Sequence, residues 1–319
     1  MIFLFSSSPA FGQDKTLRVG FLPNIAYAHA LIDQNLAAEG RGWFKERLPE
    51  VSITWQRFDV GPPALEALLA KDIDLTYVGS LPALDAYLQT QGGLSVVAGA
   101  ARGGIGLVVP AGSSLSKPED FRGKRIAVSR LGNSMDITCR RWLARGGLNV
   151  SRPGGDVIFI PVLSPSILHL FLRKEIDAAF VSEPWISWLE DKAGGRLIYA
   201  EPVETSLIAV LAARADWAET DPELVRRFTE AHRELTDWIR QNSEEAQKRV
   251  ADELTRLMKR RFSLDLLKRA WPRLVFDNEV KVEDFEFSLE AAQEAGFVKN
   301  NEDIGLEKLV SSPDLYRHR

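Results

Sequence analysis

Two stretches of this chain share one pattern of apolar and polar positions. Residues 65–81 read LEALLAKDIDLTYVGSL and residues 168–184 read LHLFLRKEIDAAFVSEP, at a constant offset of 103 positions from Leu65 to Leu168. In each copy, apolar residues at helical spacing lead through a short charged link to an apolar run of strand length, and a second turn then starts another helix. The pattern predicts one α/β unit that is used twice, once in each of two similar lobes.

The remaining periodicity extends this duplication to most of the chain. Strands are predicted at 17–22, 51–58, 72–78, 94–101, 105–110, 124–129, 156–161, 176–181, 197–199 and 206–213. Helices are predicted at 26–38, from Gly61-Pro62-Pro63 and from Ser80, and at 133–144, 167–173, 222–240, 243–259, 263–271 and 282–295. Because right-handed crossovers turn β-α-β runs into parallel sheets, we expect two such sheets, with the last helices packed on the first lobe.

Length and composition agree with two domains. The 319 residues are 45% hydrophobic and 26% charged, which is typical of a globular chain with a full core. The formal charge of −4 provides no general attraction to nucleic acid or to anionic lipid. Any anionic ligand must therefore be held by local donors. Nothing in the sequence demands an oligomer, so we expect a monomer.

The N-terminus and the cysteine count bear on the compartment. Residues 1–13, MIFLFSSSPAFGQ, have an apolar start and small residues before Gly12 but no basic segment, which indicates a shortened export signal or an unstructured polar leader. No apolar run long enough to span a membrane follows. Cys139 is the only cysteine, so neither a disulfide nor a cysteine-based metal site can form within one chain.

Candidate ligand contacts follow from the rule that open α/β sheets bind ligands beyond the carboxyl ends of their strands. Most residues at these positions are small or polar and lie where a helix is predicted to start. The candidates are Asn24, Ala26, Gly61, Pro62, Gly79, Ser80, Leu81, Gly132, Asn133, Ser134, Ser164, Glu183 and Trp185. First-turn amide groups have no partner within the helix, and the helix dipole adds about half a positive charge there. These positions therefore favour a small anion.

Several candidates also have a purely structural interpretation. Ser80, Ser134 and Ser164 could donate hydroxyl groups to the anion, or each could only cap its own helix. In the loop 131–136, Gly132 permits a close backbone approach, and Asn133 or Ser134 could both cap the helix and donate to an oxyanion. The recurrence of such positions in both lobes favours the ligand-binding interpretation.

Three side chains remain open at this point. Glu183 is an acid where the first copy has Ser80, so it either selects a solute that carries an amine or pairs with a structural arginine. Trp185 could be an apolar wall, a cation-π partner for an ammonium group, or part of the core. His29 could donate to an anion or form a packed polar contact.

Catalytic and cofactor signals are missing. His169, His232 and His318 show no metal-ligand spacing, and Gly103-Gly104-Ile105-Gly106 has neither a P-loop lysine nor the dinucleotide-binding spacing. No nucleophile, base and orienting acid can be assembled from the candidate loops. We therefore expect no cofactor, no metal and no enzymatic activity.

The strand-end motifs resemble those of the periplasmic substrate-binding proteins of nitrate/sulfonate/bicarbonate (taurine-type) ABC importers. The similarity extends from about residue 17 to 297. The motifs that carry it are RVGFLPNIAYAHAL, FDVGPPALEALLAKDIDLTYVGSLPAL, VVAGAARGG, FRGKRIAVSRLGNSMDI and IDAAFVSEPWISWLE.

The resemblance implies a type II periplasmic binding protein fold, in which two α/β lobes close by hinge motion on a small solute and dock on a permease with its ATPase. Residues 16–104 plus 206–319 would form lobe one and 105–205 lobe two, with strands 105–110 and 206–213 crossing between them. The expected solute is an aliphatic sulfonate or a taurine-like compound. A relative that binds or makes a thiamine-pyrimidine precursor has a cysteine-rich motif that is missing here, and a ligand-binding partner of a signalling receptor would use the same fold.

Overall fold

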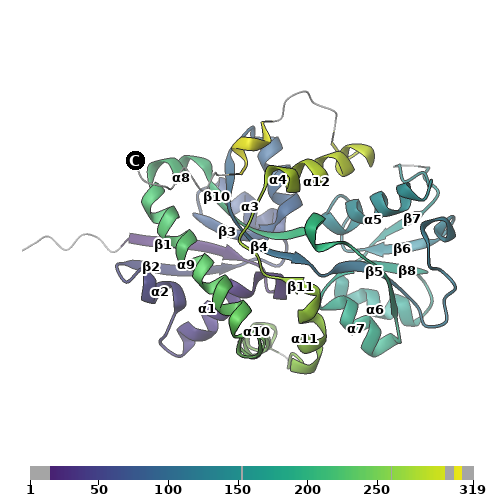
Figure 1. The fold of residues 1–319 in the computed structure, drawn as a ribbon, viewed down its shortest axis with the longest axis horizontal. Coiled ribbons are helices and arrows are strands. Elements are labelled where there is room, and N and C mark those ends of the chain that lie inside the picture. Colours follow the sequence, from purple (N-terminus) through teal and green to yellow (C-terminus); the bar gives the residue numbers. More distant parts are fainter. Residues whose placement is uncertain (1–14, 152–153, 260, 299–304, 311–319) are drawn as a thin grey trace, which may run out of the picture.

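The computed structural model describes residues 15–151, 154–259, 261–298 and 305–310, so the export signal predicted for residues 1–13 lies outside it. Two β-sheets lie side by side along the longest axis of the molecule (Figure 1). Each sheet has buried apolar clusters on both faces, which are covered by helices. This is the predicted α/β architecture with two lobes.

The first sheet has six strands in the order β11-β4-β10-β3-β1-β2. β1 is parallel to β2 and β3, whereas β10 runs antiparallel between β3 and β4. The strands are β1 (Lys15–Phe21), β2 (Val51–Arg57), β3 (Leu75–Gly79), β4 (Leu94–Gly103), β10 (Leu207–Arg214) and β11 (Leu274–Val275). The short β11, which the hydrophobic pattern did not predict, adds one edge to the sheet.

The second sheet has five strands in the order β7-β6-β8-β5-β9. Its strands are β5 (Ile105–Val109), β6 (Arg125–Val128), β7 (Ile158–Pro161), β8 (Ala178–Ser182) and β9 (Arg196–Ala200). β6 is parallel to β7 and β8, and β5 runs antiparallel between β8 and β9. The antiparallel strands β10 and β5 therefore occupy equivalent places in the two sheets. Each is the first strand that the chain forms after it has left the other sheet.

The crossing strands were predicted wrongly. Residues 105–110 and 206–213 form β5 and β10, and each of these strands lies within one sheet. The chain passes between the sheets at Gly103-Gly104, which have φ angles of +76° and +65°, and again at residues 201–206. A Cβ atom at Gly104 would lie 2.6 Å from Cδ2 of Leu274, so this crossing requires glycine.

The duplicated sequence has a structural basis at the start of each repeated strand. Asp74 accepts a hydrogen bond from the backbone N–H of Arg18 at 2.9 Å, and Asp177 accepts one from Arg125 at 2.8 Å. In both copies, the residue three positions before the aspartate is a lysine with a positive φ angle, 69° and 56°. The shared Lys-x-x-Asp segment therefore ends a helix and ties the next strand to its neighbour.

Helices fill the links between the strands. The α-helices before residue 194 are α1 (Ala28–Ala38), α2 (Trp43–Arg47), α3 (Gly61–Leu69), α4 (Ser80–Thr90), α5 (Ser134–Arg145), α6 (Ser164–Leu172) and α7 (Trp185–Ala193). Those after it are α8 (Ala215–Thr220), α9 (Pro222–Gln241), α10 (Ser243–Met258), α11 (Leu264–Ala270) and α12 (Val282–Glu294). Short 3-10 turns are η1 (Ile25–Tyr27), η2 (Pro118–Phe121), η3 (Val203–Thr205), η4 (Trp271–Arg273) and η5 (Leu306–Lys308).

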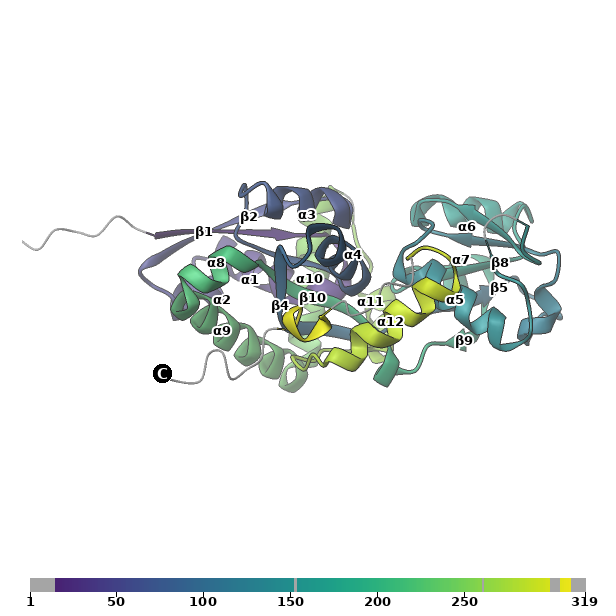
Figure 2. The same ribbon diagram turned by 90° about the horizontal axis from the view of Figure 1, so that it is seen from above.

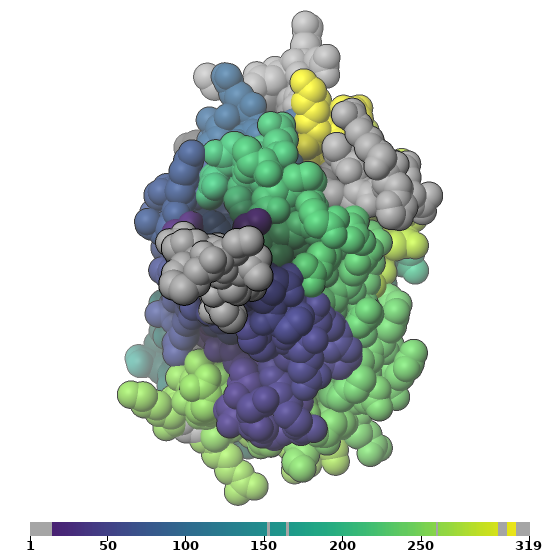
Figure 3. Space-filling model, turned by 90° about the vertical axis from the view of Figure 1, so that its left-hand side faces the viewer, coloured from purple at the N-terminus to yellow at the C-terminus, as the bar shows by residue number. Residues whose placement is uncertain are grey.

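The C-terminal helices pack mainly on the first sheet, as predicted. Helices α9, α10 and α11 contribute to the same core cluster as β1 and α1. The space-filling view of the larger end of the molecule shows these green helices against the purple N-terminal elements (Figure 3). Helix α12 does more, since Phe285 and Leu289 share a core cluster with Ile137 of α5 in the second lobe. Figure 2 shows α12 extending from the first lobe to α5.

Candidate functional site

The predicted strand-end positions lie at the N-termini of four helices. Helices α3, α4, α5 and α6 begin at Gly61, Ser80, Ser134 and Ser164. Pro62 lies in the first turn of α3, and the side chain of Ser164 lies outside the described part of the chain. Each helix start carries first-turn N–H groups without intrahelical partners.

The two helix starts of the first lobe lie next to each other. A Cβ atom on Gly61 would be 3.3 Å from Cγ2 of Val78 and 3.5 Å from Cβ of Pro82. A Cβ atom on Gly79 would be 3.1 Å from Cδ of the same proline. The start of α3 therefore lies against β3 and the first turn of α4.

Asn24 connects the two lobes at the ends of β1 and β8. Its Oδ1 accepts a hydrogen bond from the N–H of Ala26 at 2.9 Å and thereby caps η1, while its Nδ2 donates to the carbonyl oxygen of Glu183 at 3.5 Å. The methyl group of Ala26 is buried in the core of the first lobe. Asn24 and Glu183, which follow strands of different sheets, are thus brought together.

The carboxylate of Glu183 is occupied by protein groups. It accepts hydrogen bonds from Nη1 of Arg273 at 2.7 Å and from both the N–H and the hydroxyl group of Ser187, at 3.1 and 3.0 Å. Burial raises the pKa of Glu183, and the bond from Arg273 opposes that rise. Arg273 also binds Glu190 through its other terminal nitrogen at 2.9 Å. This network joins η4 to α7 across the lobes. Glu183 thus pairs with a structural arginine, which was one of its two interpretations.

Trp185 is the first residue of α7 and is partly buried. Its ring stacks on Trp188 with 4.7 Å between ring centroids and packs against a core cluster of the second lobe. One face of Trp185 is therefore covered by another aromatic ring of the same helix.

His29 lies inside the first lobe and is fully buried. Its Nε2 is 2.7 Å from the hydroxyl oxygen of Thr236, and its ring stacks on His232 at 4.2 Å. Burial and the neighbouring His232 lower the pKa of His29 well below its ordinary value. The structure thus gives His29 a packed polar contact and does not bring it to the other candidates.

The loop before α5 holds itself in place through its own polar groups. Gly132 has a φ angle of +81°, and its N–H donates to Asp136 at 2.7 Å. Asn133 caps the helix by accepting from the N–H of Asp136 at 3.0 Å, and its Nδ2 donates to the hydroxyl oxygen of Ser129 at 2.7 Å. Both polar ends of the Asn133 side chain are therefore engaged, whereas Ser134 remains at the helix start.

Ser80, Leu81 and Ser134 line one pocket between α4, α5 and α12. The pocket has a volume of about 20 Å³, which is room for about one water molecule. The hydroxyl group of Ser80 donates to the carbonyl oxygen of Leu207. The remaining lining residues are Ile105, Ile137, Thr138, Arg141, Thr205, Ser206, Leu207, Ile208, Phe287, Ser288 and Ala291.

Sequence reasoning missed the residues that the crossing segment and α12 contribute to this pocket, because nothing local shows where α12 packs. It also missed Thr138 and Arg141. A signal for these two was present, since Ser134, Thr138 and Arg141 are spaced i, i+4 and i+7 and so share one helix face.

Neither a metal cluster nor a membrane-spanning helix is found among the described residues. In that part of the chain, no cluster of three or more histidine, cysteine, aspartate or glutamate side chains could hold a metal ion. None of the helices among the described residues is both long and apolar enough to cross a bilayer.

Comparison with known proteins identifies relatives along the chain. A taurine-binding periplasmic protein of Escherichia coli is 31% identical over 186 residues, which cover 56% of this chain and 55%, about half, of that protein. A putative aliphatic sulfonates-binding protein of Bacillus subtilis is 24% identical over 318 residues, covering 94% of this chain and 91% of its own length. Both are named as binding proteins and not as enzymes.

Solved structures share the fold. The periplasmic aliphatic sulphonate binding protein SsuA from Escherichia coli superimposes with a TM-score of 0.76 at 19% identity, over 92% of this chain and 96% of that chain. The periplasmic nitrate-binding protein NrtA from Synechocystis gives a TM-score of 0.76 at 16% identity, over 96% and 88%. The expected periplasmic binding protein fold is thereby confirmed. The model of the NMT1-like family matches residues 12–255, more than half of the sequence, and the chain therefore belongs to the NMT1-like family.

Proposed function

We propose that this protein is the substrate-binding component of an ABC importer, exported to the periplasm. It binds a small oxyanion, an aliphatic sulfonate or a taurine-like solute, between lobe one (16–104 and 206–319) and lobe two (105–205), and it delivers the solute to a permease and its ATPase. The names of the relatives support this proposal, since they are taurine-, sulfonate- and nitrate-binding proteins.

The observation that carries the proposal is the pocket to which both lobes contribute a helix start. Ser80 and Leu81 lie in the first turn of α4, and Ser134 is the first residue of α5. The positive ends of two helix dipoles therefore border the same pocket. Each dipole contributes about 0.3–1 kcal/mol when exposed and more when water is excluded, so two of them in a closing pocket favour an anion.

The lining of the pocket favours a sulfonate without an amine. It combines hydroxyl groups with apolar side chains such as Leu81, Ile137 and Phe287, and none of its residues is acidic. The carboxylate of Glu201, which contacts the lining residues Arg141 and Thr205, is already bonded to both of them. An ammonium group on the solute would therefore lose its hydration without gaining a carboxylate partner, and we expect ethanesulfonate to bind more tightly than taurine.

A thermal-shift and calorimetry screen tests the proposal. The mature protein is unfolded in urea, dialysed and refolded to remove co-purified solute, and is then mixed with ethanesulfonate, taurine, nitrate, bicarbonate or a thiamine-pyrimidine precursor. A solute at 100 times its Kd stabilises the folded state by about 2.7 kcal/mol, which raises the melting temperature by several degrees. Stabilisation by the pyrimidine and by no oxyanion would refute the proposal.

A further inference from the structure

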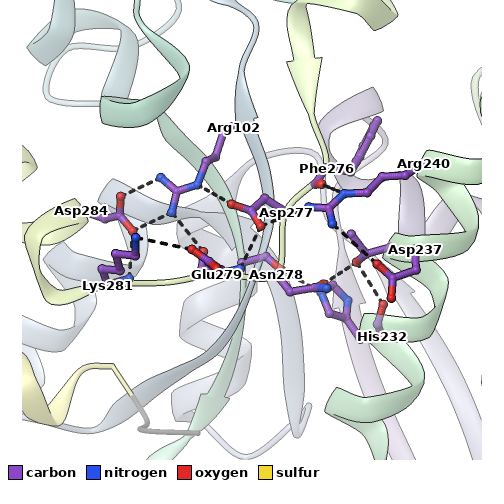
Figure 4. A network of polar contacts seen from close by, with 12 residues as sticks. Arg102, His232, Asp237, Arg240, Phe276, Asp277, Asn278, Glu279, Lys281 and Asp284 are labelled. Carbon is purple, nitrogen blue, oxygen red and sulfur yellow. Dashed lines mark hydrogen bonds and ion pairs between the residues drawn. The ribbon is translucent and has the colours of Figure 1, made fainter.

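Three arginines of the described residues are buried, namely Arg102, Arg140 and Arg141, and they differ in how their nitrogens are bonded. Arg102 donates from Nε to Asp277 at 3.0 Å and from both terminal nitrogens to Asp284 at 2.7 and 2.8 Å. Figure 4 shows this network, which holds the segment leading into α12. Arg140 donates from Nε to Asp136 at 2.8 Å and from Nη1 to the carbonyl oxygen of Val150.

Arg141, the third buried arginine, has an unused terminal nitrogen. Its Nη2 donates to Glu201, but its Nη1 is buried and has no hydrogen-bond partner among residues 15–151, 154–259, 261–298 and 305–310. The guanidinium lies over the ring of Phe287, with 3.3 Å between Cζ and the ring centroid. A buried N–H donor without a partner destabilises the folded protein.

The charge of Arg141 is also incompletely balanced. The pKa of Arg141 is lowered, because its burial outweighs the attraction of Glu201. Arg102 shows the opposite case, since its hydrogen bonds to the carboxylates of Asp284 and Asp277 raise its pKa in spite of burial. The carboxylate of Glu201 also accepts hydrogen bonds from the hydroxyl groups of Tyr199 and Thr205, so it does not interact with Arg141 alone. An additional anion beside Arg141 would therefore stabilise the guanidinium.

Arg141 stands in the wall of the pocket that Ser80 and Ser134 line. A larger groove of about 480 Å³ adjoins the same arginine, and there Glu290 and Glu294 offset the charges of Arg141 and Arg145. The small pocket has no acidic residue in its lining. An oxyanion that can reach Arg141 is therefore more stable on the pocket side.

We propose that Arg141 is a specificity-determining residue whose Nη1 donates to the anionic head of the solute in this pocket. The inference rests on the proposed function, because it assumes a solute between the lobes. The pocket holds only about one water molecule in this arrangement, so a sulfonate head enters when α4, α5 and α12 move apart. Phe287 keeps the guanidinium plane in place, and Arg102 keeps α12 in place through Asp284.

The test compares variants of the mature protein by calorimetry with ethanesulfonate. The variant R141Q removes the charge, and the double variant R141Q/E201Q does so without leaving a buried unpaired carboxylate, which protects folding. The control is R145Q, because Arg145 lies one turn further along α5 and lines the groove but not the pocket. Hydrogen bonds to charged groups contribute about 1.5–3 kcal/mol, so both Arg141 variants should bind about tenfold to a hundredfold more weakly.

The outcomes separate the inference from the proposed function. R145Q should keep the wild-type affinity within about twofold, since exposed charges contribute little. A folded double variant that binds ethanesulfonate within threefold of wild type overturns the role of Arg141 while leaving the proposed function intact. A wild-type protein that binds no oxyanion overturns the proposed function itself, and the inference with it.

Discussion

Replacing His232 by glutamine should make the first lobe less sensitive to acid. His232 is fully buried in α9, and the structure defines its tautomer. Its Nε2 lies 2.7 Å from the carbonyl oxygen of Gly99, which can only accept, so Nε2 carries the hydrogen. Its Nδ1 then accepts from the hydroxyl group of Tyr77 at 2.9 Å. The neutral ring therefore satisfies both partners, and glutamine keeps one donor and one acceptor without titrating near neutral pH.

The magnitude follows from the pKa of His232, which burial lowers from 6.5 to about 4. The unfolded chain binds this proton more readily than the folded protein does. The contribution of the neutral His232 ring to the free energy of unfolding is therefore complete above pH 6.5 and is lost as the pH falls from 6.5 toward 4. One pKa unit corresponds to about 1.4 kcal/mol, so the full loss is about 3 kcal/mol. About 2 kcal/mol of it falls between pH 7 and pH 5. His29 adds a loss of the same sign, because its pKa is lowered too.

Urea unfolding followed by tryptophan fluorescence at pH 7, 6 and 5 measures this effect. At pH 7 we expect H232Q to be about 1–2 kcal/mol less stable than wild type, because it loses the stacking of His232 on His29. At pH 5 the difference should shrink by about 2 kcal/mol and vanish or reverse. Carboxylates that titrate in this range are common to both proteins and cancel in the comparison. An equal stability difference at pH 7 and pH 5 would refute the reasoning.

Two further predictions separate structural from solute-binding roles at the interface of the lobes. S80A should lower the free energy of unfolding by about 1–2 kcal/mol, since a buried carbonyl loses its donor. S134A should leave the free energy of unfolding within about 0.5 kcal/mol of wild type and should weaken ethanesulfonate binding. The reverse order of the two variants in urea unfolding would contradict both assignments. R273M should lower the free energy of unfolding by about 3 kcal/mol, because it leaves the carboxylate of Glu183 buried without its cationic partner. R269M removes only an exposed ion pair of 3.0 Å, so it should lower the free energy of unfolding by less than about 1 kcal/mol in the same assay.

The sheets could be predicted because their signals are local. An apolar run of strand length, closed by glycine or proline, defines a strand within a few residues of its ends. The duplication then supplied the second lobe, since Asp74 and Asp177 make the same backbone contact in each sheet. The helix starts at Gly61, Ser80 and Ser134 were found for the same reason, because glycine, proline and small polar residues after a strand are a local signal. The interpretation of Ser80 and Ser134 as caps was wrong, since the N-cap residues are Gly79 and Asn133, and only Asn133 makes a side-chain cap.

The contents of the pocket could not be predicted, because they depend on contacts between distant parts of the chain. Arg141 binds Glu201, 60 positions away, and lies on Phe287 of α12. The sequence shows two adjacent arginines at 140 and 141, but it does not show that Nε and Nη1 of Arg140 are bonded whereas Nη1 of Arg141 has no partner among the described residues. The placement of α12 over α5 determines that difference, and no periodic pattern within α12 reveals it.

The turns where the two copies differ were expected to choose the solute, with Ser80 against Glu183 as the main contrast. In the structure, both residues bond to the segments by which the chain passes between the sheets. The hydroxyl group of Ser80 donates to the carbonyl oxygen of Leu207, which directly follows the second passage. The N–H of Glu183 donates at 2.7 Å to the carbonyl oxygen of Gly104, which belongs to the first passage. Their difference therefore reflects how each lobe is attached to the other. A choice among anions then requires a donor that these bonds leave unused. Arg141 also binds the second passage, because its Nη2 donates to Glu201, but its Nη1 has no partner among the described residues.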